Sequence, residues 1–193
     1  MTRDELMRAL DGVDGWLWPD EAWTLHELAR TCPAVGGRCI VEIGAWHGRS
    51  TIALTAGALH RPAPLPPVWS IDHHTGSEEH RIRAGGPVST FPAWEANLER
   101  AGVRSAVNAL VMDCHEACRR FPPASIGLCF LDGSHDLISV RRDLADWYPL
   151  LVPGGMLVVD DVGYPPIVEA LGERGLDPDR APVRVGKMAG WLV

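Results

Sequence analysis

The chain is 193 residues long, a length that fits one domain and leaves little room for a second. Apolar residues make up 46% of the chain and charged residues 22%, so a core can form without disulfides or a structural metal. The net charge of −7 repels phosphate backbones and anionic lipid surfaces, which argues against nucleic acid and membranes as partners.

The N-terminal residues 1–34 are expected to form a helical cap on the domain. Within them, residues 20–31 place Ala22 and Leu25 on one helical face, and Asp20 is available as the N-cap. The opening residues lack the apolar stretch of a signal peptide, and no run reaches about 18 apolar residues. We therefore expect a cytoplasmic protein.

Further along, short apolar runs alternate with helical patterns, which is typical of a parallel sheet with crossover helices. We expect an α/β fold with a mostly parallel seven-stranded sheet, an antiparallel C-terminal strand and helices on both faces. One of the helices should stop at Pro153-Gly154-Gly155. The expected strands are 39–45, 68–72, 109–113, 127–132 and 156–161, with a terminal pair in 183–193 around Gly186 or Gly190, and the expected helices include 49–59 and 137–151.

Residues 73–92 have no strong period and are rich in glycine, histidine and charged side chains. A loop of this length is uncommon in a compact domain, so we interpret it as an active-site lid. No internal repeat is visible. We therefore expect one domain that spans residues 1–193, with this loop over the sheet edge.

The five cysteines form no CxxC pair. Cys39 and Cys129 lie in apolar runs and are expected in the core. Cys114, His115 and Cys118 could share part of a helical turn and bind zinc. Because no second pair of ligands lies nearby, we favour a packing role for them.

Carboxylates end four of the expected inner strands. Asp72, Asp113 and Asp132 each end one strand, and Asp160 and Asp161 end the last. In an open parallel sheet, ligands bind beyond the carboxyl ends of the strands, near the point where the strand order reverses. The sequence therefore predicts that these aspartates meet in one crevice.

The first expected strand runs into a glycine-containing turn with the pattern Glu42-x-Gly44-x-x-x-Gly48-x-Ser50. We expect Gly44 to permit a tight turn and Gly48 to let the next helix start close to a ligand. The G-x-G-x-x-G pattern, which holds a pyrophosphate, is absent because position 46 is Trp46. Glu42 stands within an apolar run and suits a positively charged group of a ligand.

This motif at 42–50, the carboxylate of Asp72 and the Gly-Gly turn at 154–155 resemble the class I S-adenosylmethionine-dependent methyltransferases over nearly the whole chain. The resemblance implies a Rossmann-like methyltransferase fold and S-adenosylmethionine as cofactor, with Glu42 near its sulfonium and ammonium groups. It also implies that Asp72 accepts hydrogen bonds from the ribose hydroxyls and that Asp113 meets the adenine amino group. The implied cofactor-binding residues are Glu42, Gly44, Ala45, Gly48, Ser50, Asp72, His73, Asp113 and Asp132.

The segments around two of these strand ends are rich in catalytic side chains. Asp132, Asp160 and Asp161 can supply the oxygen ligands that a hard cation prefers. A metal there would lower the pKa of an acceptor hydroxyl. His135 follows Asp132 by three residues and would accept the proton as general base, because the ordinary pKa of histidine lies near neutral pH.

The same segments resemble the metal-dependent sugar O-methyltransferases of antibiotic and polysaccharide biosynthesis, which carry D-G-x-H, R-x-D-L, P-G-G and an acidic pair. The resemblance implies Mg²⁺ held by Asp132, Asp160 and Asp161. It also implies His135 as the base and a sugar hydroxyl of a small glycoside or oligosaccharide as the acceptor. The family often has Glu-Asp where this chain has Asp160-Asp161, and the shorter side chain changes the geometry of the metal site.

Three alternatives remain open. Catechol-type O-methyltransferases, which would act on a catechol or another small diol, place a lysine where His135 stands. An NAD-dependent oxidoreductase is disfavoured by the missing glycine and by the 28 positions between Gly44 and Asp72, where about 20 are expected. A non-catalytic donor-binding module would leave the clustered carboxylates and histidine unexplained.

Two further expectations concern surfaces. Trp16, Trp18 and Trp94 flank the expected mouth of the site and would stack on sugar faces. A homodimer is also considered, because exposed N-terminal helices and loops often mediate pairing in such enzymes.

Overall fold

One seven-stranded sheet organises the residues that the computed structural model describes, which are 1–34 and 38–193. The strands are β1 (Cys39–Ile43), β2 (Val68–Ile71), β3 (Val107–Leu110), β4 (Ile126–Leu131), β5 (Leu151–Val159), β6 (Val183–Val185) and β7 (Met188–Leu192). The helices are α1 (Arg3–Leu10), α2 (Pro19–Thr31), α3 (Arg49–Leu59), α4 (Glu78–Ala84), α5 (Phe91–Arg100), α6 (Cys114–Ala117), α7 (Leu137–Trp147) and α8 (Pro165–Glu173). Short 3₁₀ turns lie at Arg104–Ala106, Cys118–Arg120, Tyr148–Leu150 and Pro178–Arg180. Within the described ranges, no helix is long and apolar enough to cross a membrane.

The strand order is β3-β2-β1-β4-β5-β7-β6. Strands β1 to β5 are parallel, and β7 runs antiparallel to both β5 and β6. The predicted fold class, a mostly parallel Rossmann-like sheet with an antiparallel C-terminal strand, is confirmed. The order reverses between β1 and β4, and ligands bind beyond the carboxyl ends of strands at such a reversal.

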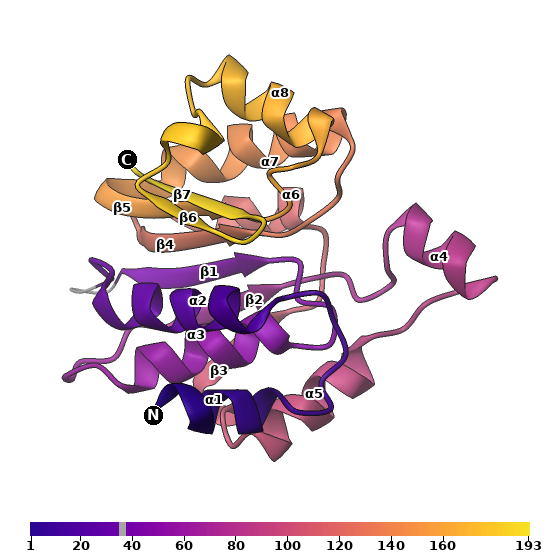
Figure 1. Ribbon diagram of the computed structural model, residues 1–193, viewed down its shortest axis with the longest axis vertical. Coiled ribbons are helices and arrows are strands. Elements are labelled where there is room, and N and C mark those ends of the chain that lie inside the picture. The colour runs from indigo at the N-terminus through magenta and orange to yellow at the C-terminus, as the bar shows by residue number, and fades with distance from the viewer. Residues whose placement is uncertain (35–37) are drawn as a thin grey trace.

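Helices cover both faces of the sheet (Figure 1). α1, α2, α3 and α5 lie on one face, and α6, α7 and α8 lie on the other. Successive side chains of an inner strand enter different cores, so Ile40 packs on the first face and Val41 on the second. Because both faces are buried, β1 reads as an almost continuous apolar run in the sequence.

Several elements of the structure have the boundaries that the sequence predicts. The helix at 49–59 is α3, and the terminal strand pair turns at Gly186 between β6 and β7. α2 differs at its start, because Pro19 takes the first helical position and Trp18 takes the N-cap position. The prediction that Asp20 caps this helix is therefore wrong.

The predicted stop of the helix at 137–151 is also wrong. α7 ends at Trp147, and a 3₁₀ turn follows, well before Pro153-Gly154-Gly155. Those three residues lie inside β5, where the pairing with β4 shifts register between Leu151 and Met156. The hydrogen-bond ladder is interrupted there, so the strand accommodates a proline and two glycines.

Residues 73–92, predicted as a loop, contain a short helix. The side chain of Ser77 caps α4, which ends before Gly85, and α5 already begins at Phe91. A seven-residue helix is too short for its period to stand out in the sequence. α4 stands away from the sheet (Figure 1), and its role as a lid stays a prediction.

Candidate active site

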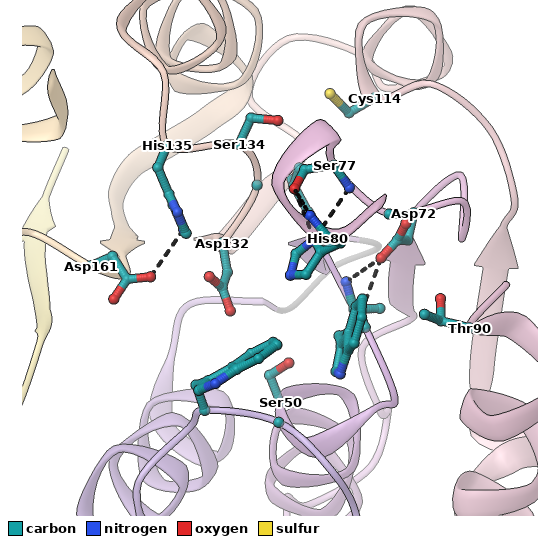
Figure 2. A pocket seen from close by; sticks show the side chains of 18 of the residues that line it. Ser50, Asp72, Ser77, His80, Thr90, Cys114, Asp132, Ser134, His135 and Asp161 are labelled. Atoms are coloured by element: carbon teal, nitrogen blue, oxygen red, sulfur yellow. Dashed lines mark hydrogen bonds and ion pairs between the residues drawn. The ribbon is translucent and has the colours of Figure 1, made fainter. Parts of the chain in front are cut away.

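A cavity of about 720 Å³ lies beyond the carboxyl ends of the inner strands. Its size falls in the range of about 300–1,000 Å³ that is usual for small-molecule sites. Figure 2 shows side chains from several strand ends gathered around it. The predicted site residues that line it are Gly44, Ala45, Ser50, Asp72, His73, Asp113, Asp132, His135 and Asp161, and those outside the lining are Glu42, Gly48 and Asp160.

The turn after β1 forms one wall of the cavity. Gly44 has a φ of +83°, and a Cβ there would overlap the carbonyl oxygen of Asp132. The Gly44 N–H donates to the carbonyl of Ile71 at 3.0 Å, and the Asp132 N–H donates to that of Ile43 at 2.8 Å. Only glycine fits so close an approach, and the turn is held between the ends of β2 and β4.

Asp72, which follows β2, also holds this turn. Its Oδ2 accepts hydrogen bonds from the backbone N–H groups of Ala45 at 2.9 Å and Trp46 at 3.1 Å. Its Oδ1 accepts one from the N–H of His74 at 2.7 Å. A carboxylate offers about four acceptor positions, so about one remains for a ligand. Binding of both ribose hydroxyls by Asp72 stays a prediction, with less room than the sequence suggested.

Two residues expected near the ligand lie against the protein core instead. Gly48 is the N-cap of α3 and lies outside the cavity lining, and a Cβ there would overlap Leu98 and crowd Trp94 of α5. Trp94 is fully buried, so its predicted place at the mouth is wrong. Trp16 and Trp18 do line the cavity and are 50% and 57% exposed.

Glu42 lies below the turn. Its carboxylate is fully buried, and Oε2 accepts hydrogen bonds from the hydroxyls of Thr51 and Ser70, each at 2.6 Å. Burial raises the pKa of Glu42 to about 7, although the neighbouring hydroxyls act in the opposite direction. Glu42 therefore supports α3 and β2 from beneath and lies outside the lining of the cavity in which a ligand would bind.

Because of Glu42, we expect the free energy of unfolding to fall by about 3 kcal/mol as the pH rises from 4.5 to about 7. In this range the folded protein keeps a proton on Glu42 that the unfolded chain has already released, so a higher pH favours unfolding. Glu42→Gln should remove this part of the slope, as measured by urea unfolding across the range. The exposed Glu99→Gln should retain it. An unchanged slope in Glu42→Gln would assign the titration to another group.

Asp132, His135 and Asp161 meet where β4 and β5 end. One ligand atom from each of the three side chains lies within 4.8 Å of the others. The Nε2 of His135 is 3.0 Å from the Oδ2 of Asp161 (Figure 2). Burial and the nearby charge of Asp160 raise the pKa of Asp132 well above its ordinary value. Burial alone would also raise the pKa of Asp161, but its hydrogen bond with His135 and the charge of Lys187 lower it.

Asp160 is buried outside this group and is bound by Lys187. The Lys187 ammonium, in the turn between β6 and β7, pairs with Asp160 Oδ2 and lies 3.2 Å from Asp161 Oδ1. Burial raises the pKa of Asp160 to about 6. The sequence analysis missed Lys187. A signal was present in the sequence, because Lys187 is the only lysine among 18 basic residues. The assignment of Asp160 as a metal ligand stays a prediction.

Asp113 lies beyond its strand, since β3 ends at Leu110. Its Oδ1 accepts a hydrogen bond from the N–H of His115 at 2.8 Å, so it caps α6 at the edge of the cavity. One carboxylate oxygen is thereby committed to the helix. A contact with the adenine amino group stays a prediction.

Two of the cysteines lie where the sequence predicts them. Cys39 and Cys129 are buried in the core, as predicted. The Cys114 thiol donates to Asp143 Oδ1 at 3.3 Å, and burial raises its pKa. One ligand atom from each of Asp113, Cys114 and His115 lies within 4.8 Å of the others, so the preference for a packing role over a zinc site stays a prediction.

An aromatic cluster that the sequence analysis missed borders the mouth of the cavity. The ring of Trp46 stacks on His80 of α4 with 4.4 Å between centroids, and the Trp16 ring lies 5.4 Å from Trp46. α4 thus contacts both the N-terminal segment and the Gly44 turn. His73 lines the cavity, whereas His74 is buried.

Comparison with known families identifies the class of the chain. Residues 41–162 match the model of a family described as a methyltransferase domain, and this match covers more than half of the chain. The chain therefore belongs to this methyltransferase family. The expected class I S-adenosylmethionine-dependent methyltransferase is confirmed at the level of the family.

Solved structures with the same fold cover nearly the whole chain. Cofactor-bound Rv0187 from MTB is 21% identical with a TM-score of 0.65, over 98% of this chain and 88% of that one. The O-methyltransferase TomG from Streptomyces achromogenes, involved in tomaymycin synthesis and solved with SAM, is 20% identical with a TM-score of 0.62, over 99% and 87%. CalS11, a TDP-rhamnose 3′-O-methyltransferase of calicheamicin biosynthesis, is 19% identical with a TM-score of 0.61, over 100% and 87%.

Proposed function

We propose that this methyltransferase transfers the methyl group of S-adenosylmethionine to a hydroxyl of a sugar or glycoside, with His135 as general base and Mg²⁺ assisting. The observation that carries the proposal is that Asp132, His135 and Asp161 share one cavity with the Gly44 turn. The acceptor class is supported by similar folds, because TomG is an O-methyltransferase and CalS11 is a TDP-rhamnose 3′-O-methyltransferase.

The wall around the Gly44 turn fits the methyl donor. Asp72 has about one acceptor position left for a ribose hydroxyl, and the Ser50 side chain also faces the cavity. Ile71 and Met112 add apolar surface on which an adenine ring would pack. S-adenosylmethionine bound there would supply the methyl group. The backbone of the Gly44 turn would form the surface on which the donor lies.

We assign to His135 the role of accepting the proton of the acceptor hydroxyl. Asp161 Oδ2 lies 3.0 Å from Nε2 of His135, so a proton on that nitrogen would be hydrogen-bonded to the carboxylate. Asp161 then stabilises the imidazolium that forms. A positioned base of this kind raises the rate by about 10²–10⁴.

The acidic side of the cavity fits a divalent cation. Asp132, Asp160 and Asp161 carry three negative charges when ionised, whereas Lys187 supplies one positive charge. Two positive charges are therefore missing at this partly buried cluster, and a hard cation prefers such oxygen ligands. Mg²⁺ held by Asp132 and Asp161 would lower the pKa of the acceptor hydroxyl.

The mouth of the cavity suits a glycoside. Trp16, Trp18 and Tyr164 are about half exposed and line the cavity. Such rings present an apolar face together with a polar edge, which matches the mixed surface of a sugar ring. Catechols would also stack on these rings, so the acceptor is decided by experiment.

The test is a methyl-transfer assay with S-adenosylmethionine and Mg²⁺, read by mass spectrometry of the acceptor. We expect methylation of TDP-rhamnose or simple glycosides and none of catechol. Asp132→Asn or a metal chelator should lower the rate on the order of 100-fold.

Asp136→Asn is the matched control for Asp132→Asn, because it removes a nearby charge while asparagine still caps α7. It should keep full activity. Methylation of catechol without any sugar would contradict the proposed acceptor. A rate that the chelator leaves unchanged would contradict the role of Mg²⁺.

A further inference from the structure

The chain has 18 lysine and arginine residues. Lys187 is the only lysine, and the other 17 are arginines. It lies in the tight turn between β6 and β7, where its ammonium pairs with Asp160 and Asp161. A lysine ammonium is a compact point charge, whereas the guanidinium of arginine is a broad planar fork. The compact ion fits between two adjacent carboxylates.

The backbone of Lys187 is fixed on two sides. Its N–H donates to Oε1 of the fully buried Glu21 at 2.7 Å, and its carbonyl accepts from the N–H of Val162 at 2.9 Å. Glu21 Oε2 accepts a further hydrogen bond from the N–H of Trp18 at 2.7 Å. Gly186 approaches Glu21 so closely that a Cβ would overlap its carboxylate. The turn is therefore anchored on α2, and the lysine side chain extends to the site from a backbone position that these contacts fix.

The two carboxylates that Lys187 binds face different surroundings. Asp160 is 2% exposed and lies outside the cavity lining, and Lys187 is its ion-pair partner. Asp161 lines the cavity and also contacts His135. The single positive charge of Lys187 is thus shared between the buried carboxylate and the cavity carboxylate, and it lies nearer to the buried one.

We propose that Lys187 is the built-in counter-cation of the acceptor site, a positioning residue that withholds Asp160 from the divalent ion and confines the ion to Asp132 and Asp161. This inference rests on the proposed function. Its charges balance, because three carboxylates are matched by one ammonium and one divalent ion. It also accounts for a lysine at this position in a chain that otherwise uses arginine.

The test is a calorimetric titration of Mg²⁺ alone into the S-adenosylhomocysteine-loaded protein. Lys187→Met, which keeps the length of the side chain but removes its charge, should bind Mg²⁺ on the order of tenfold more tightly than wild type. Removal of the ammonium takes away a repelling charge and frees Asp160 as a third carboxylate. Lys187→Arg, which keeps the charge, should show no such gain. A merely structural role for Lys187 would weaken binding or leave it unchanged.

Asp160→Asn keeps the inference testable if Lys187→Met does not fold. Because Asp160 is not a ligand in this view, Asp160→Asn should keep the Mg²⁺ affinity within about threefold of wild type, whereas Asp132→Asn should abolish binding. In the Asp160→Asn background, Lys187→Met should lose most of its gain in Mg²⁺ affinity. This double variant leaves no buried charge unpaired at position 160.

The outcomes separate the two proposals. Wild-type binding with equal or weaker binding by Lys187→Met, or a tenfold loss in Asp160→Asn, overturns the role of Lys187 alone. Binding by Lys187→Met but not by wild type would mean that Lys187 excludes the ion from the site, and it overturns the proposal that the ion lies on Asp132 and Asp161. Absence of binding in both proteins overturns the Mg²⁺ part of the proposed function together with this inference, while methyl transfer to a sugar without metal would leave the acceptor class intact.

Discussion

Replacing His135 by alanine is expected to lower kcat by a factor of about 10²–10⁴ and to leave the affinity for S-adenosylhomocysteine nearly unchanged. The imidazole lies with Asp132 and Asp161 at the ends of β4 and β5, whereas the donor turn is held by Asp72. Loss of the base therefore removes proton transfer and spares the donor wall. Initial rates at saturating acceptor and calorimetry with S-adenosylhomocysteine measure the two quantities separately.

His60→Ala is the control, because His60 lies at the end of α3, bonds to the Ala56 carbonyl and is not part of the cavity lining. It should keep the wild-type kcat. Asp161→Asn should also lower kcat, since it removes the charge that stabilises the imidazolium. A wild-type kcat in His135→Ala would assign the proton transfer to another group.

Gly44→Ala is expected to lower the free energy of unfolding by about 3 kcal/mol or more and to abolish donor binding. The φ of +83° is unfavourable for alanine, and the new methyl group would overlap the backbone carbonyl of Asp132. No flexible side chain can move aside there, so the turn or the end of β4 must shift. Urea unfolding and calorimetry with S-adenosylhomocysteine measure the two effects.

Gly172→Ala is the matched control for this substitution. Gly172 lies in α8, and a Cβ there meets nothing within 4 Å. Alanine favours a helix by about 1 kcal/mol over glycine, so this variant should be equally or slightly more stable than wild type. Wild-type stability and donor binding in Gly44→Ala would mean that the contact between the turn and β4 is not required.

Local sequence patterns predicted the elements that position the donor turn. The apolar run of β1, the small-residue helix α3 and the β6–β7 pair were all predictable, because strand burial and helix period are visible within a few residues. The register with which β5 pairs with β4 was not visible in this way. Pro153 and the two following glycines suggested a stop, whereas the register shift between the strands absorbs them.

The meeting of distant carboxylates was also predictable, but only in part. Parallel strands end at one edge, so the sequence placed Asp72, Asp132 and Asp161 around one cavity, and the structure does the same. It did not indicate that three backbone N–H groups, two of them in the turn after Gly44, occupy most of the acceptor positions of Asp72. Nor did it indicate that Glu42 lies beneath the turn, because burial depends on what packs above a strand end.

The sequence by itself determined the methyltransferase class, the strand ends that carry the site and the residues of the donor turn, since each depends on a short motif or a general rule of sheets. Only the tertiary structure decided the partner of Asp160. The antiparallel register of β5 and β7 sets Val159 opposite Ala189, and this pairing brings Lys187 beside Asp160 from 27 positions away. A charge pair across two strands leaves no local period, so it becomes visible only once the strands are paired.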